Sequence, residues 1–267
     1  MRTHGILMYY SNTGNTQTVS QYVASKFDVP FALFDICRDP IMDFSEYNVF
    51  CFATFTDCWQ PPKLMTDFLT SFSVPANAYA FSIYTYGSIP GRCNIMMTRL
   101  LRTKGFHVLP SHGIHTPENY PPVIKAGFTA EQYPQKRDMA KLRDYIAKMN
   151  VALHEIADGV MPKATLLPRI YSAKSLPQYP APLFHLFTQK YFLRVDASIC
   201  TACGVCVQVC PTKSIRMDEN AYISQDTCQS CWSCYNHCPH HAIFAGNLHG
   251  EGKYRGGSVT FQSKFKY

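Results

Sequence analysis

Eight of the twelve cysteines in this 267-residue chain lie in one short stretch, and their spacing occurs twice. Each copy reads C-x2-C-x2-C-x3-C-P, and the second copy starts at Cys228, 28 residues after the first starts at Cys200. The first three thiolates of a copy can each bind a different iron of one iron–sulfur cubane, but the fourth iron needs a ligand from elsewhere. Two copies therefore predict a pseudo-twofold domain in which each copy completes the other's site.

This spacing is that of bacterial two-cluster ferredoxins, in which the fourth cysteine ligates the opposite cluster. One [4Fe–4S] cluster is expected to be held by Cys200, Cys203, Cys206 and Cys238. The other is expected to be held by Cys228, Cys231, Cys234 and Cys210. Zinc is the main alternative, but structural zinc sites usually consist of two separated C-x2-C pairs or are completed by a histidine. Disulfides fit poorly, because reducing compartments keep thiols free.

A second candidate site lies near the start of the chain, where a short apolar run leads into a helical stretch. The connecting loop consists of Ser11, Asn12, Thr13, Gly14, Asn15 and Thr16. Amides at a helix start, three hydroxyls and a glycine that allows close approach can surround a phosphate dianion. The loop lacks the lysine of G-x4-G-K-[ST] and is not G-x-G-x-x-G. A turn that only caps the helix is the alternative.

The loop resembles the [ST]-x-T-G-x-T loop that binds the FMN phosphate in flavodoxins, and the resemblance covers about the first 155 residues. It implies strand order 2-1-3-4-5 with FMN at the switch point between strands one and three. The flavin ring would then lie between residues 54–62 and 85–92, where the candidate contacts are Thr54, Phe55, Trp59, Tyr86 and Gly87. Trp59 and Tyr86 are the candidates for stacking on the ring, although a tryptophan is often simply a core residue. Residues 55–59 lack the glycine that this family usually has there.

The elements that position these residues follow from hydrophobic periodicity. Strands are expected at 6–10, 31–35, 48–54, 79–84 and 106–109, and helices at 15–27, 63–72, 94–104 and 135–157. Alternating strands and helices predict an α/β fold, a flavodoxin-like doubly wound parallel five-stranded sheet. A small α+β two-cluster ferredoxin domain would follow it.

Composition divides the chain into four parts. We expect a flavodoxin-like FMN-binding domain at 1–158, a proline-rich basic linker with a short helix at 159–192, a ferredoxin domain at 193–250 and a C-terminal tail at 251–267. We interpret the positively charged linker as a solvated connector. The alternative is a docking surface for an acidic redox partner. The formal charge of +7 is largely offset by two anionic clusters and a flavin phosphate, so no nucleic-acid partner is expected. No apolar run is long enough to span a membrane and no signal peptide is evident, which predicts a cytoplasmic protein.

The whole arrangement resembles the flavodoxin–ferredoxin fusion proteins found in anaerobic bacteria and archaea. This resemblance implies an iron–sulfur flavoprotein that passes low-potential electrons between two [4Fe–4S] clusters, FMN and a redox partner protein, which would be a ferredoxin or an oxidoreductase. A reductase of a small molecule bound over the flavin is the alternative. A carrier is favoured because Asp57 is the only acidic residue in the expected flavin loops. The sequence does not decide whether the protein forms a homodimer. It also leaves open the roles of Cys58 and Cys93, which are most simply interpreted as small apolar core residues.

Overall fold

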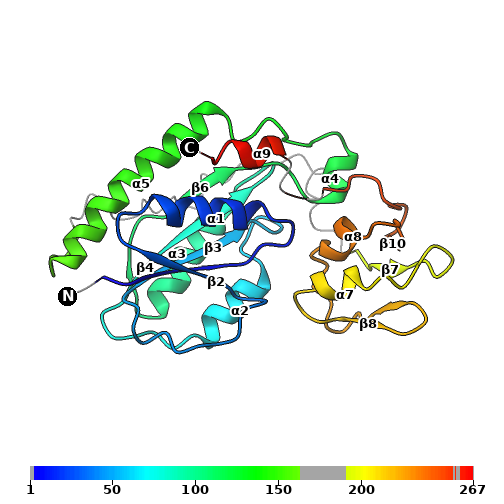
Figure 1. Ribbon diagram of the computed structural model, residues 1–267, viewed down its shortest axis with the longest axis horizontal. Helices are drawn as coiled ribbons and strands as arrows, with labels where there is room; N and C mark the ends of the chain where they lie inside the picture. The colour runs from blue at the N-terminus through cyan, green and yellow to red at the C-terminus, as the bar shows by residue number, and fades with distance from the viewer. Residues whose placement is uncertain (1–2, 163–190, 255, 257–258, 267) are drawn as a thin grey trace.

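The computed structural model describes residues 3–162, 191–254, 256 and 259–266. The N-terminal part forms an open sheet covered by helices, and the cysteine-rich part packs beside it, next to the end of the sheet where β1 and β3 finish (Figure 1). We refer to these two parts as the first domain and the cysteine domain. Most of the expected linker, residues 163–190, lies outside the described residues. No helix in the described ranges has the length and apolar character needed to cross a membrane.

Five parallel strands form the main path of the sheet. They are β1 (Gly5–Tyr9), β2 (Phe31–Asp35), β3 (Val49–Phe55), β4 (Tyr79–Tyr86) and β5 (His107–Val108). Their order is β2-β1-β3-β4-β5. This is the flavodoxin-like doubly wound order, in which the switch point lies between β1 and β3. The expected fold class and strand order are therefore confirmed.

The fifth strand position is divided between two short strands. β5 pairs with the start of β4 at Tyr79 and Ala80, whereas β6 (His112–His115) pairs in parallel with the end of β4. Pro110 lies between them and has no amide proton for the ladder. The expected strand at 106–109 therefore corresponds only to β5, the first half of this strand position. The second half, His-Gly-Ile-His, was missed because it lacks a strand-like apolar pattern.

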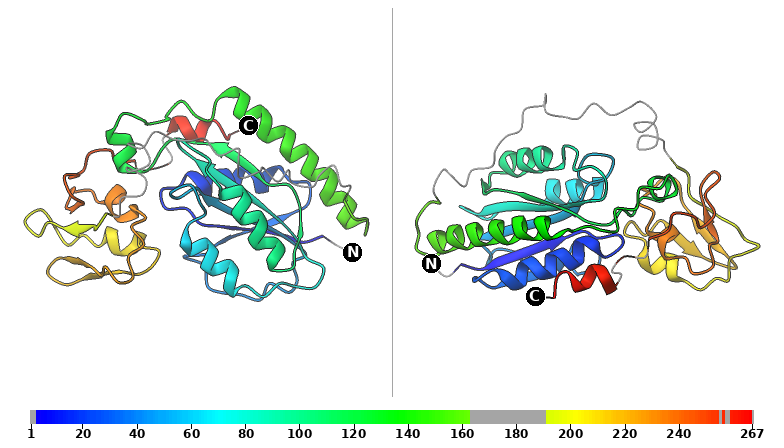
Figure 2. Two further views of the ribbon diagram at one scale, coloured as in Figure 1. Left: turned by 180° about the vertical axis from the view of Figure 1, so that it is seen from behind. Right: turned by 90° about the horizontal axis from the view of Figure 1, so that it is seen from above.

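Two helical layers cover the sheet, as the view from above in Figure 2 shows. On one face, α1 (Asn15–Lys26) and α5 (Lys136–Ala157) share a core with Leu7. On the other face, α2 (Lys63–Ser71) and α3 (Cys93–Thr103) share a core with Ile6 and Met8. Neighbouring residues of β1 thus point to opposite layers, as strand geometry requires. Both faces of β1 are apolar because both are buried.

The cysteine domain has the pseudo-twofold organisation that the repeat predicts. Its two short helices, α7 (Val205–Val209) and α8 (Ser233–His237), contact each other and hold equivalent positions in the two copies. Two small antiparallel pairs complete it. They are β7 (Arg194–Val195) with β10 (Ile243–Phe244), and β8 (Ile215–Met217) with β9 (Ala221–Ile223).

The last segment of the chain returns to the first domain. Helix α9 (Val259–Ser263) lies beside α1, and its Phe261 is buried in the core between the sheet, α1 and α5. Phe265 joins the same core, with its ring 5.4 Å from that of Tyr22. The expected C-terminal tail is therefore packed against the first domain, and the chain crosses between the two domains twice.

Candidate functional site

Four of the eight cysteines line one cavity on the far side of the cysteine domain. These thiols, the outer set, are Cys200, Cys203, Cys206 and Cys238. Three come from the first repeat and the fourth from the second. Cys203 is exposed, whereas Cys206 and Cys238 are buried. The structure thus brings together the four residues that the sequence assigns to one cluster.

The other four cysteines form an inner set beside the first domain. Cys210, Cys228, Cys231 and Cys234 lie close enough for each of the first three to act electrostatically on Cys234. Two of these sulfurs also accept backbone hydrogen bonds. The amide of Ser214 lies 3.3 Å from Cys210 Sγ, and the amide of Ser230 lies 3.4 Å from Cys228 Sγ. Amide donors of this kind are one of the factors that set cluster potentials.

Both sets fit a [4Fe–4S] cluster, because each offers four thiols drawn from both repeats. Burial raises the pKa of Cys231 to about 12, and burial also raises the pKa of Cys234 well above its ordinary value. A buried thiol therefore favours its neutral form unless a cation stabilises the thiolate. Bound iron is such a cation, so the inner set would hold these thiolates only together with its metal.

The phosphate-loop candidate has the geometry of an anion site. Gly14 is the N-cap of α1 with a φ of 96°, and no side chain caps this helix end. The first turn contains no acidic residue, while Asn15 and Thr16 are buried. A helix start without a cap leaves amide protons and a partial positive charge that favour an anion. The loop has the backbone character of an anion site, but in this structure the Ser11 hydroxyl accepts from the Gly14 amide and the Thr13 hydroxyl accepts from the Asn119 side chain.

Side chains of the same loop also hold the cysteine domain in place. The Asn12 side-chain amide donates to the backbone oxygen of Cys231 at 2.9 Å. The Ser233 hydroxyl donates to the backbone oxygen of Asn12 at 3.1 Å. The Asn15 side chain accepts a hydrogen bond of 2.8 Å from the hydroxyl of Tyr254, in the returning C-terminal segment. The first domain and the inner set therefore share one buried polar interface at the β1–α1 loop.

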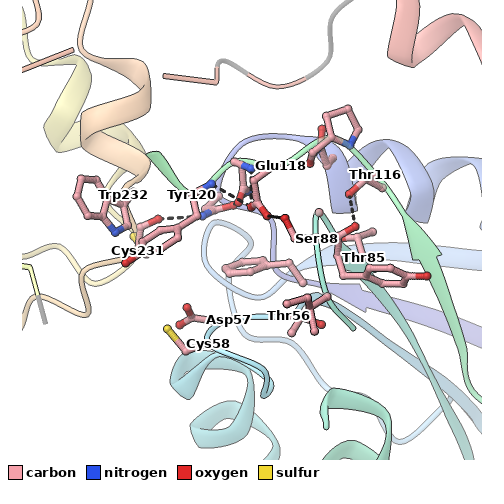
Figure 3. A pocket seen from close by; sticks show the side chains of 18 of the residues that line it. Thr56, Asp57, Cys58, Thr85, Ser88, Thr116, Glu118, Tyr120, Cys231 and Trp232 are labelled. Carbon is pink, nitrogen blue, oxygen red and sulfur yellow. Dashed lines mark hydrogen bonds between the residues drawn. The ribbon is translucent and has the colours of Figure 1, made fainter. Parts of the chain in front are cut away.

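A cavity extends from this loop into the space between the loops that follow β3 and β4. It is lined by Asn12 and Asn15, by Phe55, Trp59 and Tyr86 of the first domain, and by Cys231 and Trp232 of the cysteine domain. Figure 3 shows Cys231 and Trp232 on one side of the cavity and Asp57 and Cys58 on the other. The two loops touch, since the Arg92 amide donates to the Trp59 carbonyl at 2.6 Å.

This cavity measures about 60 Å³, which is small beside the ~300–1,000 Å³ typical of ligand sites. The phosphate end is closed, because the Asn119 side chain donates to Asn12 and Thr13 and Gly256 packs against the Thr13 carbonyl. A flavin ring would fit only after a wall has moved. Segment 116–120 lines the cavity without regular secondary structure, and its Thr116 and Glu118 amides donate to the Tyr86 and Thr129 carbonyls at 2.9 Å.

Glu118 anchors this covering segment. Its carboxylate accepts hydrogen bonds from the amides of Asn119 and Tyr120 and from the hydroxyl of Ser88, at 2.9–3.1 Å. Burial raises the pKa of Glu118, and these three donors partly offset that effect. The backbone oxygen of Asn119 in turn accepts from the Asn236 side chain of the cysteine domain at 3.0 Å. The segment thus joins the cavity wall to the inner set.

The predicted cofactor residues divide into those that line the cavity and those that do not. Phe55, Trp59, Tyr86 and Gly87 line it, whereas Thr54 is fully buried in the sheet. Tyr86 stacks on His115 with ring centroids 4.9 Å apart. In the phosphate loop, the Thr16 hydroxyl lies 2.9 Å from the Thr85 hydroxyl, and the Ser11 hydroxyl accepts from the amide of Gly14 at 3.1 Å.

Sequence reasoning missed Glu118 and Tyr254 at this site. The long insertion after the fifth strand, with residues 119–122, was expected to cover the flavin edge, and Asn119 and Tyr120 do line the cavity. Sequence reasoning did place Cys58 and Cys93 in or beside the expected flavin loops. Burial raises the pKa of both thiols to about 12, although part of the Cys58 side chain is exposed and Asp57 adds to its shift. Neither thiol is activated as a nucleophile.

Comparison with known proteins identifies the cysteine domain. Residues 192–239 match the 4Fe-4S dicluster domain family. A ferredoxin of Pyrobaculum islandicum is 37% identical over 51 residues, which are 18% of this chain and 48% of that protein. Ferredoxin-1 of Rhodobacter capsulatus is 42% identical over 40 residues, 15% of this chain and 62% of that protein. This chain thus spans only part of the length of these relatives.

Solved flavodoxins resemble the first domain. An archaeal flavodoxin is 14% identical with a TM-score of 0.44, and the match covers 57% of this chain and 99% of that one. Flavodoxin 1 of Bacillus cereus is 16% identical with a TM-score of 0.41, covering 54% of this chain and 95% of that one. The assignment of the first domain to the flavodoxin-like fold rests on its own strand order.

Proposed function

Because the chain joins a flavodoxin-like α/β domain to a 4Fe-4S dicluster domain, we propose that it is an electron-transfer protein with two [4Fe–4S] clusters and one FMN. In this proposal it accepts low-potential electrons at the outer set and delivers them at the cavity to a redox partner protein, a ferredoxin or an oxidoreductase. When bound, the clusters supply one-electron steps and the flavin supplies both one- and two-electron steps.

One observation carries this proposal. Cys231 and Trp232 of the second cysteine repeat line the same cavity as Trp59 and Tyr86, which lie on the loops expected to hold the flavin ring. A ligand of the inner cluster and the flavin site would therefore share one wall. The shared wall supports a short path for electrons inside the chain.

The two cysteine sets are suited to different tasks. Cys203 of the outer set is exposed, so a partner protein can approach this end of the path. Cys234 is buried, and Cys231 is half-buried beside the first domain, where its backbone oxygen accepts from Asn12. Asn12 and Ser233 hold the inner repeat against the first domain and so fix its distance from the cavity.

A reductase of a small molecule is the second candidate, and one feature of the cavity favours it. Glu118 and Asp57 both line the cavity, and burial raises the pKa of each. Either carboxyl therefore holds its proton to a higher pH than an exposed carboxyl does and is a candidate donor to a reduced substrate. The sequence had offered Asp57 as the only acidic residue of the expected flavin loops, which favoured a carrier. Glu118→Gln would slow the reduction of a small molecule bound in the cavity. It would not slow electron transfer to a partner protein.

Anaerobic reconstitution with iron, sulfide and FMN tests the proposal. We expect about eight irons and one FMN per chain, and about half the iron after either Cys203→Ala or Cys231→Ala. Flavin reduction by a chemically reduced ferredoxin should fail in both variants. A chain that binds iron but no FMN would restrict the function to the cysteine domain. A chain that binds zinc stoichiometrically and no sulfide would overturn the proposal.

A further inference from the structure

The side chain of Asn119 lies on the phosphate loop. Its nitrogen donates to Asn12 Oδ1 at 3.0 Å and to Thr13 Oγ1 at 2.9 Å. Both of these residues belong to the loop that the sequence assigns to the FMN phosphate. Thr13 is only 4% exposed in this arrangement. A phosphate group that is to bind the Thr13 hydroxyl must therefore take over the contact that Asn119 now makes.

The backbone of Asn119 is held on both sides of this side chain. Its amide donates to the buried Glu118 carboxylate at 2.9 Å, and its carbonyl accepts from the Asn236 side chain at 3.0 Å. Asn236 is fully buried in α8 of the cysteine domain, and its side-chain oxygen accepts from the Tyr254 amide at 3.0 Å. The docked domains thus fix the Asn119 backbone, and the side chain is the part that can rotate away from the loop.

We infer that Asn119 is a gate on the phosphate loop, which lowers the affinity of the chain for FMN but not for riboflavin, the same flavin without a phosphate. The inference rests on the proposed function, because it takes FMN as the ligand of this cavity. FMN binds only to the fraction of molecules in which the Asn119 side chain has rotated out. The apparent affinity is reduced by that fraction. Asn236 keeps the gate in place from the cysteine domain.

The specificity of the effect follows from the chemistry of the two ligands. The gate is closed by two hydrogen bonds between neutral groups. A phosphate dianion makes stronger hydrogen bonds than these, so it can displace the Asn119 side chain, but the cost of opening still counts against its binding. Riboflavin places no group at Thr13, so it binds without opening the gate.

Asn119→Ala in the full-length chain, reconstituted with iron and sulfide, tests this inference. The substitution removes the side chain and keeps the backbone bonds to Glu118 and Asn236. Dissociation constants for FMN and for riboflavin are measured by ultrafiltration, with the free flavin read from its fluorescence. We expect the affinity for FMN to rise about tenfold, which corresponds to an open fraction of about one tenth in the wild type. The affinity for riboflavin should stay within about twofold.

Asn150→Ala is the matched control. Its side chain is also half-buried and also joins two segments, because it donates to the Lys26 carbonyl and accepts from the Asp28 amide, both at 3.2 Å. These contacts lie at the opposite end of α1 from the phosphate loop. This variant should leave both affinities unchanged.

Two results would overturn the gate while leaving the proposed function intact. One is an affinity for FMN that is unchanged or lower in Asn119→Ala. The other is an equal gain for FMN and riboflavin, which would indicate a cavity that is looser as a whole. If neither the wild type nor Asn119→Ala binds FMN, both the gate and the flavin part of the proposed function are wrong.

Discussion

The two cysteine repeats have the same spacing but opposite surroundings, as the position after the second cysteine shows. Gly204 fills it in the outer-facing repeat and Trp232 in the inner one, and both are N-caps of short helices in left-handed conformation, with φ of 77° and 63°. Glycine adopts this conformation freely, whereas any side chain strains it by about 1–2 kcal/mol. The inner repeat therefore accepts strain that the outer repeat avoids.

The compensation for that strain is visible around Trp232. Its indole packs edge-on against Tyr120, Tyr191 and Tyr235, with centroids 5.2–5.7 Å apart. A Cβ added at Gly204 would meet no atom within 4 Å. One repeat is thus built into an interface and the other is left open. Two repeats of the same spacing therefore differ at this position because only one of them packs against the first domain.

The largest expected effect is on Trp232. Trp232→Ala removes the aromatic packing and keeps the strain, so it should destabilise the cluster-loaded chain by about 3–5 kcal/mol. Trp232→Gly should cost about 1 kcal/mol less, because it also relieves the strain. Denaturant unfolding at matched iron content measures both. The paired variant Gly204→Ala should cost only about 1 kcal/mol. Equal losses at the two positions would contradict the asymmetry.

Asn12 should show the next largest effect. Asn12→Ala leaves the buried Cys231 carbonyl without this donor and removes the acceptor of the Asn119 side chain. Loss of such buried hydrogen bonds costs about 1–3 kcal/mol. Hydrogen exchange should rise at residues 231–236 and stay unchanged at residues 203–208. The exposed Asn247→Ala is the control, and we expect an effect within about 0.5 kcal/mol.

The smallest expected effect is a pH dependence at Glu118. Its folded-state pKa is raised by burial above the ordinary value of 4.5. Its contribution to stability is therefore present below about pH 4.5 and is lost as pH rises through the raised folded value. Between pH 5 and 8 the free energy of unfolding should fall further in the wild type than in Glu118→Gln. If the free energy of unfolding had the same pH dependence in the two proteins, Glu118 would not be the residue responsible for it.

Most of the first domain could be predicted because its signals are local. The strand at residues 31–35 has the predicted bounds, and the other main strands and helices differ by one or two residues at an end. The split fifth strand could not be predicted, since β6 is held by pairing with β4 and not by its own pattern. Glu118 escaped prediction because burial, which alone makes a glutamate notable, depends on distant residues.

The sequence by itself determined the eight-cysteine repeat and the α/β order, and it predicted a phosphate site at residues 11–16, because each depends on spacing within a short segment. The tertiary structure alone decided that Cys231 rather than Cys203 faces the first domain and that residues 259–265 return to the first core. The two repeats are nearly equivalent as sequences, so only packing could distinguish them. That distinction separates the outer set, with its exposed Cys203, from the inner set beside the cavity.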